Sequence, residues 1–234
     1  MKQRVVVFSP HPDDETLACG GTIAKTVHQG NEVYVVTMTD GRNSHRFVLH
    51  IDKDPTPEEI SAIRRSEARQ AAEILGVKQD NLVFLDFEDG SLSHNISEAK
   101  ARVRDILANL NPNMIFIPSE YDIQKDHRAT NMIVSLALKE LALQLAVYAY
   151  VVWPDSRKLQ RSLRTLLGAL RPATVIRIDI SDFIQIKKKA MSVYKSQSTL
   201  LFPSQNKPIL DEYTLANLMR PTECFSEVHN ESPR

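Results

Sequence analysis

The sequence predicts an α/β fold in which a doubly wound, mostly parallel sheet is flanked by helices. Short apolar runs rich in β-branched residues alternate with longer stretches of helical period, which is the pattern of βαβ units. The chain has 234 residues, of which 42% are hydrophobic and 25% are charged. This length and composition suit one globular domain with a sizeable core, so we expect a single domain over residues 1–234.

The individual elements follow from that alternation. The first apolar run, residues 4–9, begins directly after a charged N-terminus, and the later runs that we expect to be strands are 32–38, 82–86, 114–118, 148–152 and 174–180. The stretches of helical period between and after them are 16–28, 57–75, 97–110, 129–145 and 182–194. The triplet of lysines at 187–189 on the last helix is expected to be a solvated face.

One helix carries signals for both of its ends. Thr56 and Pro57, followed by Glu58 and Glu59, are typical of a helix N-terminus, and Gly76 is typical of a C-cap. Residues 43–54 are expected to form a loop that could close on a substrate. From about residue 202 onward the chain is polar and without clear period, so we expect an irregular surface segment there.

The charge balance excludes several classes of protein. Lys and Arg number 29, as do Asp and Glu, so the net charge is zero, and a nucleic-acid partner is not expected. The longest uncharged apolar stretch, residues 141–154, is shorter than the roughly 20 residues that cross a bilayer. Cys19 and Cys224 form no disulfide or thiolate metal pattern, and no secretory signal is visible, so we expect a cytoplasmic protein.

The chemistry is concentrated in two loops. In a doubly wound sheet the loops after the first and fourth strands face each other across a crevice, and here these loops span residues 10–15 and 119–127. Asp13 and Asp14 could cap the following helix. Alternatively, His11 and Asp14, three residues apart on a tight turn, could bind a metal together with His127 from the facing loop, leaving positions open for water and substrate.

These residues resemble a known family. The matching motifs, which run from the first strand to about Gln197, are His11-Pro12-Asp13-Asp14-Glu15, Gly20-Gly21-Thr22, Thr39-Asp40-Gly41, Arg64-x-x-Glu67, Ala71-Ala72, Leu75-Gly76-Val77, Asp126-His127-Arg128 and Tyr194-x-Ser196-Gln197. On them the chain is similar to the LmbE-like, PIG-L family of zinc-dependent N-acetylglucosaminyl deacetylases. The resemblance implies a Rossmann-like fold, a homo-oligomer (trimer or hexamer), and release of acetate from a small N-acetylated sugar or glycoconjugate.

The resemblance also implies roles for individual residues. Zn²⁺ would be held by His11, Asp14 and His127, and Asp13 would be the general base. Such a site activates water near neutral pH and polarises the acetyl carbonyl. Arg64 would grip the sugar or a phosphate, although an arginine on a helix face is as readily solvated. Asp89 would bind a sugar diol, or else it is a turn residue before Gly90.

The chain departs from the family at Gln124, where a histidine usually precedes the Asp-His pair. The first of three alternatives, in order of preference, is that Asp13 acts as both base and acid while Gln124 is a neutral hydrogen-bond donor to the oxyanion. The second is that another residue takes the role of the missing histidine. The third is that the protein binds metal and sugar with little turnover. Asp126, which in the family orients the missing histidine, stays a catalytic candidate. A metal hydrolase of another amide or of a phosphate ester is a further alternative. A neutral sugar fits this acidic pocket better than a polyanion does.

Overall fold

The computed structural model describes residues 2–153 and 174–228 of the chain. Within them lies one sheet of seven strands in the order β3-β2-β1-β4-β5-β7-β6. The five strands from β3 to β5 are parallel, whereas β7 is antiparallel to both of its neighbours. The strand bounds are β1 Arg4–Ser9, β2 Glu32–Thr39, β3 Leu82–Phe87, β4 Met114–Pro118, β5 Ala146–Tyr150, β6 Val175–Asp179 and β7 Thr222–Glu227.

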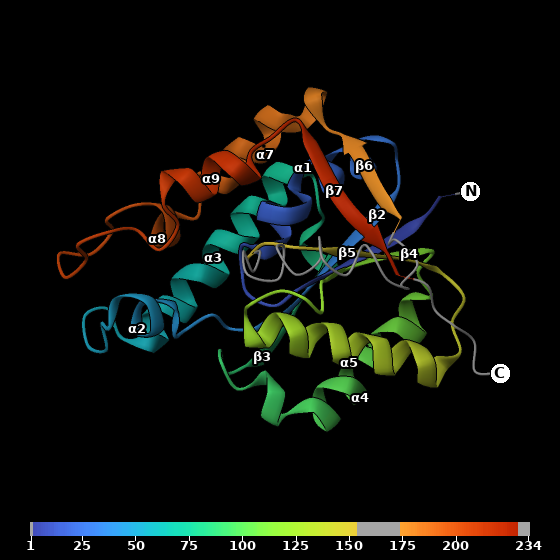
Figure 1. Ribbon diagram of the computed structural model, residues 1–234, viewed down its shortest axis with the longest axis horizontal. Helices are drawn as coiled ribbons and strands as arrows, with labels where there is room; N and C mark the ends of the chain where they lie inside the picture. The colour runs from blue at the N-terminus through green and yellow to red at the C-terminus, as the bar shows by residue number, and fades with distance from the viewer. Residues whose placement is uncertain (1, 154–173, 229–234) are drawn as a thin grey trace, which may run out of the picture.

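Helices cover both faces of the sheet (Figure 1). One face carries α1 Asp14–His28, α3 Pro57–Leu75 and α7 Ile184–Met191, and the other carries α4 Ile96–Leu110 and α5 Lys125–Leu141. The shorter helices are α2 Ser44–Leu49, α8 Lys195–Ser198 and α9 Glu212–Leu218, and three 3₁₀ turns are Gln79–Asn81, Leu92–His94 and Ser181–Phe183. The predicted fold class, a doubly wound and mostly parallel sheet flanked by helices, is therefore confirmed.

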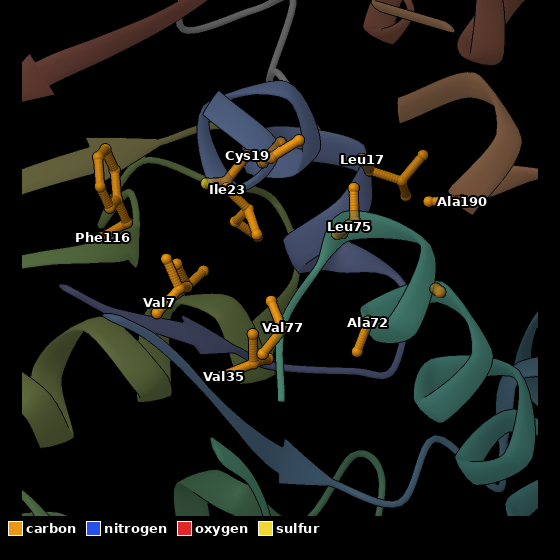
Figure 2. Close-up of a cluster of buried hydrophobic side chains, with 14 of the residues drawn as sticks. Val7, Leu17, Cys19, Ile23, Val35, Ala72, Leu75, Val77, Phe116 and Ala190 are labelled. Carbon is orange, nitrogen blue, oxygen red and sulfur yellow. The ribbon is translucent and has the colours of Figure 1, made fainter. Parts of the chain in front are cut away.

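The core consists of two layers because side chains alternate along each strand. Val5 and Val7 of β1 pack with α1, α3 and α7, whereas Val6 and Phe8 pack with α4 and α5. Figure 2 shows the first layer, in which Val7 of β1 and Val35 of β2 lie on the side of Ile23 of α1 and Leu75 of α3, while Leu17 lies toward Ala190 of α7. The central strands are thus buried on both faces, as expected of a parallel sheet between two helical layers.

Helix α3 begins and ends where the sequence predicts. The Thr56 side chain accepts a hydrogen bond from the Glu59 amide, while the Glu59 side chain accepts from the Thr56 amide, which completes a capping box. Pro57 occupies the first turn, and Gly76 ends the helix with φ of 83°. Glycine adopts this left-handed conformation without the steric penalty of a side chain.

The largest differences from the sequence-based expectation concern four segments. Helix α5 spans Lys125–Leu141 rather than 129–145, because the polar residues that were assigned to the loop form its first turn, and β5 lies two residues earlier than expected. Helix α2 lies within the expected loop 43–54. The segment after residue 202 contains α9 and β7 rather than being irregular throughout, and β7 lies inside the sheet.

A buried ion pair between α7 and β7 corrects a further expectation. Lys187 of α7 is buried, and its Nζ lies 2.7 Å from Oε1 of Glu223 in β7. The same carboxylate accepts hydrogen bonds from the Gly21 and Thr22 amides of α1. A Cβ on Gly21 would lie 2.3 Å from Ile180, so only glycine permits this close approach. Lys187 therefore belongs to the interior and not to the solvated face.

Candidate active site

A cavity of about 260 Å³ lies where β1 and β4 run side by side. From this point the sheet continues with β2 and β3 on one side of β1 and with β5 on the other side of β4. The chain order therefore reverses here, and the loop after β1 meets the loop after β4. The described residues that line it are His11, Asp13, Asp14, Ser44, Phe47, Val48, Arg64, Asp89, Ile123, Gln124, Trp153, Gln197, Ile209 and Leu210. The predicted position of the site at the β1–β4 crevice agrees with this cavity.

The turn after β1 is built to present two carboxylates in different directions. Asp13 has a φ of 129°, which is strained for a residue with a side chain. It stands at the N-cap of α1, yet its side chain makes no capping hydrogen bond. Glu15 braces the turn, since its carboxylate accepts from the Ser9 hydroxyl and the Asp13 amide. The capping alternative for Asp13 is therefore wrong.

His11 and Asp14 line the floor of the cavity, and the fully buried His127 lies next to them. Oδ2 of Asp14 lies 3.1 Å from Nδ1 of His11 and 3.1 Å from Nε2 of His127, and the three atoms lie within 4.8 Å of one another. Asp14 and His127 are buried and His11 is partly exposed. This two-histidine, one-carboxylate set is a ligand set typical of a catalytic zinc site.

Each of these histidines has a second carboxylate on its other ring nitrogen. Oδ1 of Asp89 lies 3.2 Å from Nε2 of His11, and Oδ2 of Asp122 lies 3.1 Å from Nδ1 of His127. Asp122 is itself fixed by the amides of Gln124, Val152 and Trp153. Such outer carboxylates hold the ring orientation and tautomer of metal-binding histidines. The sequence reasoning missed Asp122, which is the second acid after β4 and is buried although its neighbours in the loop are exposed.

His127 provides a test of whether this set suits a metal. Both ring nitrogens are buried, and neither is aligned for a hydrogen bond with its neighbouring carboxylate. Buried polar nitrogens are rarely left without a partner. A cation between Nε2 of His127, Nδ1 of His11 and Asp14 would satisfy that nitrogen, so the residues present fit a bound metal ion.

The electrostatics of the cavity floor are those of an acidic site. Burial alone would lower the pKa of His127, but the Asp14 and Asp122 carboxylates raise it to about 9. Burial opposes a charged His11 as well, yet Asp89, Asp126 and Asp14 raise its pKa well above its ordinary value. Both pKa shifts arise because the nearby carboxylates stabilise a positive charge on the ring.

Arg64 is placed against Asp13 and not in solvent. Its side chain is buried, with Nη2 at 3.0 Å from Oδ1 of Asp13, and it donates hydrogen bonds to the carbonyl oxygens of Pro12 and Gly41. A Cβ on Gly41 would lie 2.5 Å from the guanidinium, so the absence of a side chain there makes room for it. Burial raises the pKa of Asp13 to about 8, with Arg64 opposing the shift. The geometry gives Arg64 the role of positioning Asp13.

Gln124 and Asp126 occupy the start of α5. Gln124 is the N-cap residue and is exposed at the cavity wall. Asp126 is buried; its Oδ2 accepts a hydrogen bond from the Gly90 amide and lies 3.5 Å from Nε2 of His11, while Oδ1 has no partner. Asp126 thus points toward His11. Together with His11 and Asp89 it forms a second group that could hold a metal ion.

The Tyr194 motif has a supporting function that sequence reasoning could not assign. Tyr194 Oη donates a 2.5 Å hydrogen bond to Glu15, the residue that braces the turn after β1. Ser196 donates to Glu67 through both its amide and its hydroxyl. Gln197 reaches the cavity wall itself. No local pattern could reveal these contacts, because they join residues 129 or more positions apart.

The fold and the site together define an α/β protein with the ligand set of a metal-dependent hydrolase. The chain belongs to the PIG-L family, whose model, described as GlcNAc-PI de-N-acetylase, matches residues 6–138. This match confirms the resemblance drawn from the His-Pro-Asp-Asp-Glu and Asp-His motifs. No helix of the described part of the chain is long and apolar enough to cross a membrane.

Individual relatives span most of the chain. The diacetylchitobiose deacetylase of Thermococcus kodakarensis is 25% identical over 210 residues, covering 83% of this chain and 70% of that protein. The probable N-acetyl-alpha-D-glucosaminyl L-malate deacetylase 2 of Bacillus cereus is 28% identical over 201 residues, covering 85% of each. Among solved structures, the 4-carboxy-2-hydroxymuconate hydratase of Pseudomonas putida shares the fold, with a TM-score of 0.73 and 20% identity over 100% of this chain and 99% of that one.

Proposed function

We propose that the protein is a zinc-dependent hydrolase that removes the acetyl group from an N-acetylglucosamine-type sugar and releases acetate. The observation that carries the proposal is the meeting of His11, Asp14 and the buried His127 beside a separately held Asp13, with His11, Asp13 and Asp14 lining one cavity. The deacetylase names of two relatives that span most of the chain support it.

The metal would be held by His11, Asp14 and His127. When bound, a zinc ion supplies Lewis acidity that makes the acetyl carbon a better electrophile and water a better nucleophile near neutral pH. Asp89 and Asp122 keep the two histidine rings in their orientations through contacts of 3.2 and 3.1 Å.

Asp13 is the general base and then the acid. It takes a proton from the attacking water as the oxygen bonds to the acetyl carbon, and returns that proton to the sugar nitrogen as the C–N bond breaks. Arg64 keeps one oxygen of Asp13 fixed at 3.0 Å, which leaves the other for proton transfer. The second water proton is released from the new carboxyl group and taken up by the amine, so the products are acetate and the protonated amino sugar, and atoms and charge balance.

Gln124 serves as a neutral hydrogen-bond donor to the oxyanion that forms at the acetyl oxygen. Its exposed side chain at the cavity wall can donate from its amide but holds no titratable proton. Asp126 positions His11, whose Nε2 lies 3.5 Å from Oδ2 of Asp126. We extend the proposal to a homo-oligomer and a cytoplasmic location, for which the family resemblance and the sequence are the support.

The test is acetate release by the purified protein. Metal content is measured first, and acetate is then followed with N,N'-diacetylchitobiose and several N-acetylglucosaminides before and after removal of the metal by a chelator. We expect turnover that the chelator abolishes and added Zn²⁺ restores. Because a hydratase shares this fold, the fold alone does not choose the reaction. A zinc-loaded protein that releases no acetate from any of these compounds would refute the proposal.

A further inference from the structure

Three exposed apolar side chains line the cavity. Phe47 and Val48 of α2 and Ile123 of the β4–α5 loop line it, although they are 56%, 43% and 51% exposed. Trp153, Ile209 and Leu210 line the same cavity. Large exposed apolar side chains that gather around one opening usually mark a binding surface rather than chance exposure.

The α2 part of this rim is fixed to the catalytic floor. The Asn43 amide donates a 3.0 Å hydrogen bond to Asp89, and the Asn43 side chain donates to the Asp89 carbonyl oxygen. The ring of Phe47 lies over Gly90, where an added Cβ would come within 2.8 Å of it. Phe47 therefore lies against Gly90, next in sequence to Asp89, which contacts His11, and both Phe47 and Asp89 line the cavity.

The charges of the cavity do not suit an anion. Among the described lining residues the only Lys or Arg is Arg64, and its guanidinium is already engaged by Asp13, Pro12 and Gly41. The lining carboxylates are Asp13, Asp14 and Asp89. Apart from the proposed metal ion, which the reacting acetyl group would occupy, a negatively charged substituent would find no free Lys or Arg among the described lining residues, which is costly in a partly buried site.

We infer that the sugar substrate carries an uncharged apolar substituent, alkyl or aryl, that lies against Phe47, Val48 and Ile123. The inference rests on the proposed function and specifies its substrate class. A hydrophobic contact of several methylene groups with this rim stabilises the complex without any new charge interaction.

Matched glycosides test the inference. The hexyl, 5-carboxypentyl and methyl glycosides of N-acetylglucosamine share the reacting group and differ in length or in one terminal carboxylate. We expect kcat/KM for acetate release from the hexyl compound to exceed that from each of the others by roughly tenfold or more. A carboxypentyl or methyl glycoside that reacts as well as the hexyl glycoside would overturn the inference while leaving deacetylation intact.

Substitutions locate the effect. Phe47→Ser and Ile123→Ser should each raise KM for the hexyl glycoside by roughly fivefold to tenfold more than KM for the methyl glycoside. Leu136→Ser, an exposed apolar position on α5, is the control and should change neither. Equal loss with both glycosides would contradict the inference.

Two further readouts separate the alternatives. If neither rim substitution alters the hexyl preference but both lower the oligomer mass in solution, a second copy of the chain covers this face and the inference is wrong. If no glycoside releases acetate, the proposed function fails. Calorimetric binding of the hexyl against the carboxypentyl glycoside then still decides the inference: a preference for hexyl supports it, and equal binding overturns it.

Discussion

Asp13 combines three observations that are unusual for a residue at the start of a helix. Its φ is 129°, its side chain does not cap α1, and its carboxylate faces a buried guanidinium. Strained backbone of this kind costs on the order of 1–3 kcal/mol and persists where the surroundings impose it. Here Glu15 and Arg64 impose it from two sides, which keeps Asp13 out of the metal set formed by its neighbour Asp14.

Replacing this carboxylate should abolish turnover without removing the metal. For Asp13→Asn we expect kcat to fall by about 10²–10⁴-fold, because the amide can neither take nor return the proton. Zinc content measured on the same preparation should stay at one ion per chain. Asp80→Asn, an exposed position outside the site, is the control. An Asp13→Asn protein that keeps its activity would assign the base to another residue.

Gln124 should contribute through hydrogen bonding alone. We expect Gln124→Ala to lower kcat roughly 10²-fold with little change in KM, which is the usual effect of losing one oxyanion donor. Gln124→Glu, with nearly the same shape but no amide donor, should lose as much. If Gln124→Glu retains full activity, the side chain at this position is not a donor to the oxyanion.

A histidine at this position should add a proton donor. We expect the Gln124→His protein to be at least as active as the parent. Its kcat should also decline as pH rises through the imidazole pKa, ordinarily about 6.5, because the neutral ring no longer donates a proton. The measurement is a pH profile of both proteins. A histidine variant whose profile matches that of the parent would show that this group takes no part in proton transfer.

Helix α2 shows how an element can be missed in sequence and still shape the site. It has only six residues and no capping hydrogen bond, so neither period nor end signals distinguish it from a loop. Tertiary contacts stabilise it: His45 is 1% exposed and packs edge-on against Phe202. The start of α5 could not be predicted because polar site residues form its first turn. The limits of β5 could not be predicted because residues 141–153 form one nearly continuous apolar run.

His45 should make the stability of the protein depend on pH. Burial, with the positive charge of Arg64 acting in the same direction, lowers the pKa of His45 to about 4. In the unfolded chain this histidine titrates near 6.5, so between about pH 6.5 and 4 the unfolded state binds more protons. The free energy of unfolding should therefore fall as pH decreases through this window, by about 2–3 kcal/mol from this residue.

The check is urea unfolding at pH 7 and pH 4.5 for the parent, for His45→Asn and for His50→Asn, which changes an exposed histidine of the same segment. His45→Asn should lose part of the pH dependence, whereas His50→Asn should keep it. Identical slopes for all three proteins would mean that other groups govern acid sensitivity.

At the scale of the whole molecule, the sequence predicts the parallel half of the sheet better than the rest. The runs that form β1 to β4 are mostly apolar and largely buried, and the two loops that carry His11, Asp14 and His127 follow β1 and β4 directly. Strand β7 alternates polar and apolar residues over a short stretch, and its neighbours in the sheet are far away in sequence. Lys187 could not be recognised as buried because its partner, Glu223, lies 36 residues later.

This buried pair should matter to global stability. Lys187→Met leaves the Glu223 carboxylate without its cation in the interior, and removal of one partner from a buried pair typically costs about 3–5 kcal/mol. Lys188→Met, next in sequence and exposed, should change the free energy of unfolding by less than about 0.5 kcal/mol. Denaturant unfolding of both variants measures the difference, and equal stabilities would show that Glu223 is satisfied by the Gly21 and Thr22 amides alone.

The position of β7 in the sheet also constrains the order in which the chain can fold during translation. Strand β6 leaves the ribosome more than forty residues before β7, yet among the described strands its hydrogen-bonded neighbour is β7. Until Thr222–Glu227 have emerged, β6 cannot join the sheet and Lys187 has no Glu223 to meet. The metal loops after β1 and β4 are translated long before that, so the catalytic floor can assemble while the far side of the sheet still awaits its last strand.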